Sequence, residues 1–194
     1  MKTVILGLAM ATCLTLPAFA ALKVGDTAPD FTATASLGGK EFTFKLADAL
    51  KKGPVVVYFY PSAYTGGCDL EAHTFAGSAD KFTAAGASII GVSADNMERL
   101  NQFAADPAFC AGKFPIASDE SLTVAKSYNL STTPPRDGAK DVRGIEIGHG
   151  FIERVTYVIG KDHKILAVMS SKDDKLSPDQ HVDKSLAIVQ QTKS

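Results

Sequence analysis

The amino-acid sequence predicts one α/β domain, in which a central β-sheet is flanked by helices. Two apolar runs that contain β-branched residues, 55–60 and 87–92, are typical of strands buried on both faces. Residues 68–85 between them carry apolar side chains at helical spacing. Strand, helix and strand together predict a parallel βαβ unit with a right-handed crossover. The chain has 194 residues, of which 45% are hydrophobic, enough for one domain with a sizeable core.

Shorter elements are expected before and inside this unit. Residues 42–44 alternate as in a short strand, and residues 46–52 have the spacing of one or two helical turns. Gly53-Pro54 ends that helix, Pro61 ends the first buried strand, and Gly86 ends the long helix. The helix breakers therefore fall where the apolar periodicity changes.

The second half of the chain extends the same sheet. Asp95 is a candidate N-cap for a helix that ends at Asp106-Pro107. In chain order we then expect a short edge strand at 113–117, a short helix at 121–129, a long loop at 131–150, a β-hairpin at 153–159 and 165–169, and a helix at 178–191. The hairpin would add antiparallel strands to the parallel unit, which is the layout of a thioredoxin-like sandwich with a central mixed sheet.

The first twenty residues differ from the rest and predict a signal peptide. A short basic start precedes an apolar run, and Ala18-Phe19-Ala20 offers the small-x-small pattern that a signal peptidase cuts. The run is shorter than the roughly 20 residues that a membrane-spanning helix needs, although a retained anchor is an alternative. Cys13 would suit a lipoprotein, but the residue before it fits a lipobox poorly. We expect an exported, periplasmic protein whose domain is 21–194.

Charge and cysteine content narrow the classes of function. The formal net charge of −1, without blocks of like charge, gives no reason to expect nucleic-acid or anionic-membrane binding. The histidines and cysteines are not spaced as a metal site requires, and we expect no metal or other cofactor. Cleavage near Ala20 would leave two cysteines, Cys68 and Cys110. A structural disulfide is one interpretation, although a domain of this size does not need one to fold.

The stretch around Cys68 carries the chemistry. A buried strand ends, a loop with Pro61 and Thr65 follows, and Cys68 falls in the first turn of the next helix. Free backbone N–H groups and the positive end of the helix dipole favour a thiolate there, because such positions lower the pKa of a cysteine. Gly66-Gly67 permits the tight turn. We therefore expect Cys68 to be an exposed, nucleophilic thiolate with the Thr65 hydroxyl beside it.

Further polar residues are candidates for the same site. Glu71 lies one helical turn after the cysteine and is either a supporting residue or only a favourable carboxylate in the first turn. Arg154, taken alone, would be a solvated strand residue. His149 could line the pocket, whereas His163 and His181 are expected at the surface.

Four motifs, in order, resemble those of the peroxiredoxin family. Pro61-x-x-x-Thr65-x-x-Cys68 matches the family's active-site motif. Residues 24–31 are similar to the family's usual start, and Ser93-Ala94-Asp95 and Arg154-x-Thr156-Tyr157-x-Ile159 fit as well. The likeness covers essentially the whole chain after residue 20 and is greatest to the bacterioferritin-comigratory, or PrxQ-like, branch.

The resemblance implies a role for each matching residue. Cys68 would attack the O–O bond of hydrogen peroxide or an organic hydroperoxide and become a sulfenic acid. Thr65 would hydrogen-bond the thiolate and the substrate, Arg154 would stabilise charge on the breaking bond, and Pro61 would shield the sulfur. The reductant would be a thioredoxin-like protein or a membrane disulfide reductase, and the chain a monomer or weak dimer.

One position departs from this branch. Its members often carry a resolving cysteine five residues after the peroxidatic one, where this chain has His73. Cys110 is the candidate resolving residue, provided that its Cα can come within about 4.4–6.8 Å of the Cα of Cys68. Reduction by an external thiol, an intermolecular disulfide, and a role for Cys110 as a small buried hydrophobe remain open.

Three other functions fit the sequence less well. A thioredoxin-like thiol–disulfide oxidoreductase would normally carry Cys-x-x-Cys, which Cys68 does not begin. A non-catalytic binding module of the same fold would be expected to have lost Cys68, Thr65 or Arg154. A hydrolase that pairs Cys68 with His149 would need an orienting Asn or Asp, and no such pattern is present. The predicted function is therefore a thiol-dependent peroxidase.

Overall fold

The computed structural model describes residues 21–192, so the predicted signal peptide lies outside the described part of the chain. In chain order the elements are β1 (Thr32–Leu37), β2 (Lys40–Lys45), α1 (Leu46–Leu50), β3 (Val55–Phe59), α2 (Gly66–Ala84), β4 (Ser88–Ser93), α3 (Met97–Ala105), β5 (Ile116–Ser118), α4 (Thr123–Ser127), β6 (Thr132–Thr133), β7 (Phe151–Ile152), β8 (Val155–Ile159), β9 (Ile165–Ser170) and α5 (Pro178–Gln191). Among these helices none is both long and apolar enough to cross a bilayer.

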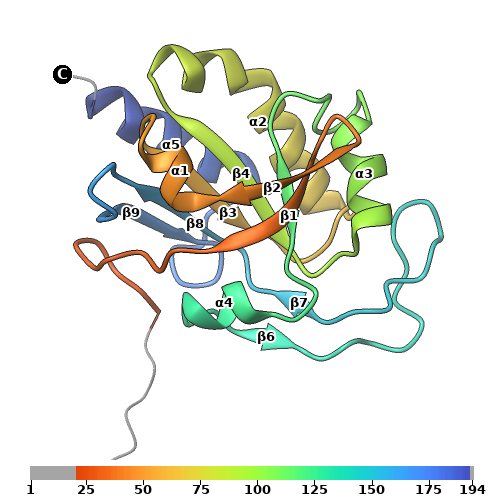
Figure 1. Ribbon diagram of the computed structural model, residues 1–194. Helices are drawn as coiled ribbons and strands as arrows, with labels where there is room; N and C mark the ends of the chain where they lie inside the picture. Colours follow the sequence, from red (N-terminus) through yellow and green to blue (C-terminus); the bar gives the residue numbers. More distant parts are fainter. Residues whose placement is uncertain (1–20, 193–194) are drawn as a thin grey trace, which may run out of the picture.

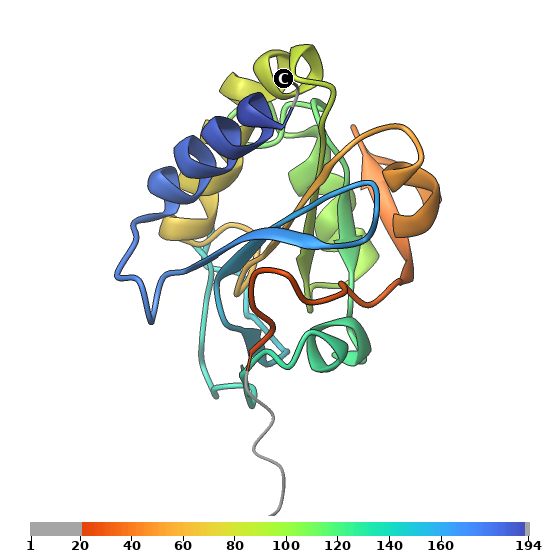
Figure 2. The same ribbon diagram turned by 90° about the vertical axis from the view of Figure 1, so that its left-hand side faces the viewer.

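Seven strands form one mixed sheet in the order β2-β1-β5-β4-β3-β8-β9. β3 pairs parallel with β4 and antiparallel with β8, and β4 pairs parallel with β5. Helices α2, α3 and α5 pack on one face of the sheet, and α1 and α4 pack on the other (Figures 1 and 2). β6 and β7 form a separate two-stranded sheet. The predicted α/β sandwich with a central mixed sheet is confirmed.

The central strand β3 separates two apolar cores. All five of its residues are buried, and their side chains alternate between the faces of the sheet. Val55, Val57 and Phe59 belong to the core beneath α1 and α4, whereas Val56 and Tyr58 belong to the core beneath α2 and α5. Because both faces are covered, the strand is a continuous apolar run rather than an alternating one.

Tyr58 fixes the long helix against the sheet. Its ring stacks on Phe75 of α2, with the ring centroids 4.6 Å apart. The same ring covers Gly91 of β4, where an added Cβ would lie 2.6 Å from the nearest ring atom. Glycine is therefore required at position 91 if β4 and the tyrosine are to stay where they are.

The sequence analysis does not predict β1, β6 or β7. β1 reads TATASL, a regular alternation that the sequence analysis passed over because two of its three apolar residues are alanines, and the strand pairs with β2 and β5. β6 and β7 have two residues each, too few to show a period. The βαβ unit, the late hairpin and the final helix are confirmed, with ends that differ by a few residues.

The predicted N-cap of α3 is wrong. Asn96 caps this helix, because its side-chain oxygen accepts the Arg99 N–H at 2.9 Å. Asp95, one residue earlier, is fully buried and accepts the main-chain N–H of Ala63 at 2.8 Å. Either residue could cap the helix from its place in the sequence, and the contact with the loop after β3 decides between them.

Candidate active site

The loop after β3 delivers Cys68 into the first turn of α2. Thr65 holds the N-cap position with an extended backbone, and Gly66 begins the helix, two residues before its predicted start. The Thr65 hydroxyl donates to the Ser62 carbonyl at 2.7 Å, and the Thr65 carbonyl accepts the Cys68 N–H at 2.7 Å. Cys68 therefore lies at the positive end of the helix dipole, as predicted.

The Cys68 sulfur is buried, whereas the sequence predicted an exposed one. The residue is 2% exposed and belongs to the apolar cluster on the α2 side of the sheet. Burial raises the pKa of the Cys68 thiol, while Arg154, the Ser62 main chain and the Thr65 side chain act to lower it. The predicted lowering of this pKa is wrong for the conformation described, because desolvation of the anion outweighs its hydrogen bonds and the nearby charge.

Arg154, the residue just before β8, reaches the sulfur with its guanidinium. Its Nη2 donates to Cys68 Sγ at 3.0 Å, and its Nη1 donates to the Glu71 carboxylate. A Cβ added to Gly67 would lie 3.3 Å from Nη2, so the bare backbone at this position leaves room for the guanidinium. The structure thus brings together three residues that the sequence separates, and it couples the thiol to a buried carboxylate.

Two buried polar side chains lie behind the guanidinium. Glu71 is fully buried, and burial raises its pKa to about 7 against the lowering effect of Arg154. His181 of α5, expected at the surface, is also fully buried, with Nδ1 2.9 Å from the Thr156 hydroxyl and Nε2 3.0 Å from the Ser171 hydroxyl. Burial lowers the pKa of His181 to about 4, so its ring is neutral near pH 7.

A cleft of about 720 Å³ opens beside the active-site loop, with Pro61 and Thr65 on one side. The long loop between β6 and β7 and the start of β7 form the opposite wall, which includes Arg136, Ile147 and Phe151. The Arg136 guanidinium lies over the Phe151 ring at 5.0 Å from its centroid. This cleft gives a small molecule a path to the start of α2.

Cys110 is a free thiol in the turns after α3, and it is as deeply buried as Cys68. Both cysteines belong to the same apolar cluster, and burial raises the pKa of Cys110 as well. His73 of α2 has its Nδ1 3.0 Å from the Ala108 carbonyl, so the helix contacts the segment that carries Cys110. The two cysteines share one core with both sulfurs reduced.

His149 lies next to Asp95, with its Nε2 2.7 Å from Asp95 Oδ1, and it contacts the active-site loop through Ser62 at 3.5 Å. The structure therefore gives the histidine a carboxylate partner instead of the sulfur. Within residues 21–192, no group of three or more His, Cys, Asp or Glu side chains is arranged to hold a metal ion.

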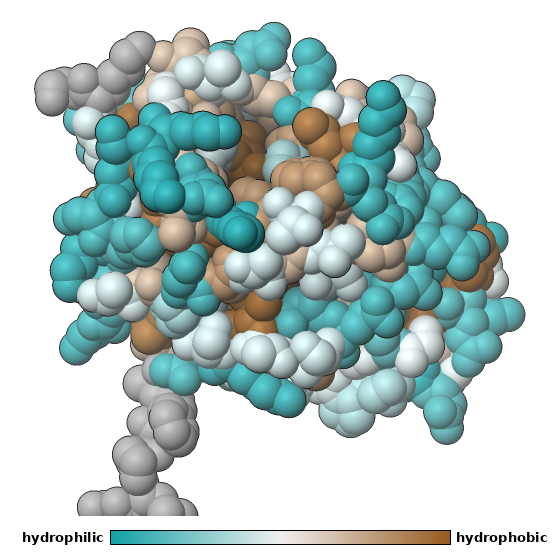
Figure 3. All heavy atoms as spheres, in the orientation of Figure 1, coloured by the Kyte–Doolittle hydropathy of each residue, from teal (hydrophilic) through white to brown (hydrophobic). Residues whose placement is uncertain are grey.

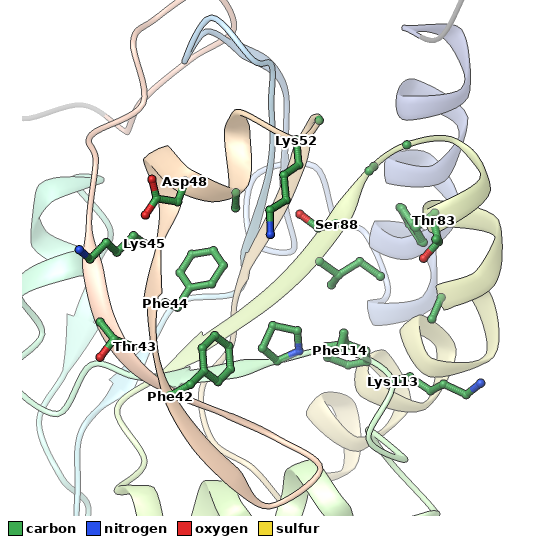
Figure 4. Close-up of a pocket in the computed structure, with 18 residues that line it drawn as sticks. Phe42, Thr43, Phe44, Lys45, Asp48, Lys52, Thr83, Ser88, Lys113 and Phe114 are labelled. Atoms are coloured by element: carbon green, nitrogen blue, oxygen red, sulfur yellow. The ribbon is translucent and has the colours of Figure 1, made fainter.

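Another groove, of about 680 Å³, lies at the opposite end of the sheet between β2, α1, α2 and β4. Phe42, Phe44 and Phe114 line it (Figure 4), and apolar side chains surround a hollow on this face of the molecule (Figure 3). Ser88, the first residue of β4, borders the groove. Cys68 follows the carboxyl end of the parallel neighbour β3, so this groove is separate from the candidate active site.

Known proteins are similar to this chain in both sequence and fold. The model of the AhpC/TSA family matches residues 24–168. A peroxiredoxin of Mycobacterium tuberculosis is 34% identical over 89% of this chain and 99% of its own length. The chloroplastic peroxiredoxin Q of Sedum lineare is 32% identical over 90% of this chain and 82% of its own. The crystal structure of peroxidoxin BcpB from M. tuberculosis has a TM-score of 0.72 and 32% identity, over 89% of this chain and 99% of its own.

These likenesses and the geometry at the start of α2 define a thioredoxin-fold enzyme that works through a cysteine. The chain belongs to the AhpC/TSA family and is a peroxiredoxin, similar to peroxiredoxin Q and the bacterioferritin-comigratory proteins. Peroxiredoxins are thiol-dependent peroxidases, so the predicted family, fold and activity are confirmed.

Proposed function

We propose that Cys68 is the peroxidatic cysteine of this peroxidase and that hydrogen peroxide or an organic hydroperoxide is its substrate. The contact between Cys68 Sγ and Arg154 Nη2, at 3.0 Å in the first turn of α2, carries the proposal. The thiolate forms an S–O bond as the O–O bond breaks. Cys68 becomes a sulfenic acid, and the second oxygen takes up a proton and leaves as water or an alcohol.

The neighbouring side chains have distinct roles in this step. Arg154 holds the thiolate and stabilises the negative charge that grows on the leaving oxygen. The Thr65 hydroxyl turns from the Ser62 carbonyl to the thiolate or the peroxide, and Pro61 shields the sulfur at the cleft. Glu71 orients the guanidinium through the hydrogen bond that it accepts from Nη1.

The test is peroxide consumption by the purified protein with a thiol reductant. Wild type is expected to consume hydrogen peroxide and cumene hydroperoxide, and the Cys68→Ser variant neither. Cys110→Ser is the matched control, since it should still show the first oxidation in a single turnover. A Cys68→Ser variant that keeps the peroxidase rate would overturn the assignment.

Resolution is proposed to involve Cys110. The sulfenic acid of Cys68 would condense with the Cys110 thiol, releasing water and forming an intramolecular disulfide. Both sulfurs are buried and reduced in the structure, so the start of α2 has to unwind before the bond can form. A thiol reductant, either a thioredoxin-like protein or a membrane disulfide reductase, would then restore both thiols. A mixed disulfide between this donor and the Cys110→Ser variant, trapped in cells, would identify it.

The remaining proposals concern location and assembly. We expect export to the periplasm and removal of the signal peptide near Ala20, and we expect a monomer or a weak dimer. N-terminal sequencing of the protein from fractionated cells should give a start near Ala21. Sedimentation at several concentrations measures the assembly, and a stable higher oligomer would contradict the expected monomer or weak dimer.

A further inference from the structure

A second cluster of charged side chains lies behind the active-site loop and has no part in the roles described above. Its centre is Asp95, which is fully buried between β4 and α3. One carboxylate oxygen accepts the Ser62 hydroxyl at 2.7 Å, and the other accepts the Ala63 N–H at 2.8 Å and the Ser93 hydroxyl at 2.7 Å. Asp95 therefore holds two consecutive residues of the loop that leads to Cys68.

His149 approaches the same carboxylate from the other side. Its Nε2 lies 2.7 Å from Asp95 Oδ1, and its Nδ1 lies 2.8 Å from the Gly150 carbonyl oxygen. Carboxylate and carbonyl oxygens only accept hydrogen bonds, so both ring nitrogens must donate. Only the imidazolium form carries two N–H groups. Both hydrogen bonds therefore form together only when His149 is a cation, paired with the Asp95 carboxylate.

The two pKa shifts agree with this geometry. Burial opposes the charged form of His149, but the hydrogen bond and charge of Asp95 outweigh it and raise the pKa of His149 above 6.5. Burial also opposes the Asp95 carboxylate, but His149 and the Ala63 N–H keep the pKa of Asp95 below its usual value.

The position of His149 links this ion pair to the wall of the cleft. His149 lies at the end of the long loop between β6 and β7, and the centroid of its ring is 6.0 Å from the centroid of the Phe151 ring. Phe151 lines the cleft opposite Pro61 and Thr65. The Asp95 carboxylate therefore joins the two walls, since it holds the active-site loop on one side and the Phe151 wall on the other.

We propose that Asp95 and His149 are positioning residues of the peroxidase, which lock the active-site loop and the opposite wall of the cleft in the reactive arrangement. The inference rests on the proposed role of Cys68 and adds a proton-dependent step to it. When His149 loses its proton, one of its two hydrogen bonds is lost, the wall loosens, and each thiolate reacts more slowly with peroxide.

The surrounding charges determine how the ion pair responds to pH. Four other charged side chains line the same pocket as His149: Glu98, Arg99, Arg143 and Glu146. Arg99 lowers the pKa of His149, and its Nε lies 3.0 Å from Asp95 Oδ1. Asp95 therefore keeps a cationic partner when His149 is neutral, and the fold is expected to survive that change.

The sign of the pH dependence follows from the raised pKa. The stabilising effect of the charged histidine is fully present below its unfolded value of 6.5 and is lost as pH rises through the higher folded value. The thiolate fraction of Cys68 also increases as pH rises. The rate must therefore be divided by the measured thiolate fraction before the effect of His149 can be seen.

The experiment is a single-turnover oxidation of Cys68 from about pH 5 to 9, across the range where histidine titrates. Stopped-flow mixing with cumene hydroperoxide gives the rate constant, and titration of the thiolate absorbance gives the thiolate fraction. In wild type, the rate constant per thiolate should fall roughly ten-fold as pH rises, less than the roughly hundred-fold that a misplacement of about 1 Å can cost. His149→Gln should be slow at every pH, without this fall.

The matched control is His163→Asn, since His163 lies in the turn between β8 and β9, in a left-handed backbone conformation that asparagine tolerates. This variant should keep the wild-type fall. A His149→Gln variant with the wild-type profile would overturn the inference while Cys68→Ser stays inactive. A Cys68→Ser variant that remains active would instead overturn the proposed function. Circular dichroism tests whether the His149→Gln variant is folded. If that variant is unfolded, Ser62→Ala gives a second measurement, because it removes only one contact to Asp95. Ser62→Ala should lower the rate per thiolate, and a wild-type rate would count against the inference.

Discussion

Replacement of Arg154 by glutamine tests the central contact of the site. The variant removes the cation that lies 3.0 Å from Cys68 Sγ and leaves a neutral polar side chain that is two atoms shorter. A hydrogen bond to a charged group is worth about 1.5–3 kcal/mol, and this one is largely shielded from solvent. At about 1.4 kcal/mol for each factor of ten, the thiolate fraction at a given pH should fall by about 10- to 150-fold.

Two measurements separate this loss from a loss of transition-state stabilisation. Titration of the thiolate absorbance gives the Cys68 pKa, which should rise in Arg154→Gln. The stopped-flow rate constant with hydrogen peroxide should fall by more than the thiolate fraction does, because the leaving oxygen also loses its partner. Arg154→Lys keeps the charge but cannot bond to sulfur and carboxylate together in the same way. Its Cys68 pKa and rate constant should therefore lie between those of wild type and Arg154→Gln. An unchanged Cys68 pKa in Arg154→Gln would refute the reasoning.

Three further predictions concern other parts of the chain. Peroxide should produce an intramolecular disulfide in wild type, seen as loss of both alkylatable thiols, whereas Cys110→Ser should leave a sulfenic acid that dimedone traps. The raised pKa of Glu71, about 7 against an ordinary 4.5, should contribute about 3 kcal/mol of stability below pH 4.5 that is lost above pH 7, measured as the change with pH in the difference between urea unfolding of wild type and of Glu71→Gln. Gly91→Ala should lower the free energy of unfolding by about 1–3 kcal/mol through its clash with the Tyr58 ring, whereas Gly77→Ala, with open space around it, should not.

The sequence was sufficient to predict the elements around the site because their patterns are local. The buried strand, the loop and the helix start that place Cys68 all lie within one short stretch, and the structure has them in that order. Arg154 lies 86 positions away, and no local pattern points to its contact with the sulfur. Its prediction came from the resemblance of its motif, since the pairing of β8 with β3 is a long-range event.

Burial was the property that the sequence could not supply. The prediction of an exposed Cys68 used the helix start alone, whereas desolvation depends on side chains that other elements pack over it. His181 was expected at the surface as a residue of the last helix. A face formed by His181, Val182, Ser185 and Val189 is nevertheless buried, and its spacing is the signal that could have revealed the histidine. Asp95 was likewise assigned to a cap because its partner loop is distant in sequence.

The glycine at position 66 leads to a prediction about the step that follows peroxide reduction. The proposed disulfide requires the first turn of α2 to unwind, while the Phe75 and Phe82 rings keep the rest of the helix in the core. Glycine in a helix is less stable than alanine by roughly 0.5–1 kcal/mol, so Gly66 lowers the cost of that unwinding. A Cβ at this position would meet no atom within 4 Å, so Gly66→Ala should fit without a clash.

Gly66→Ala should therefore slow disulfide formation by about two- to five-fold, the rate equivalent of that free energy. The first oxidation of Cys68 should change less, because the arginine already contacts the sulfur in the wound helix. Quenched-flow alkylation separates the two steps, since sulfenic acid accumulates only when the second step is slowed. If Gly66→Ala slows both steps equally, unwinding precedes the attack on peroxide, and the buried, wound conformation is a resting state rather than the reactive one.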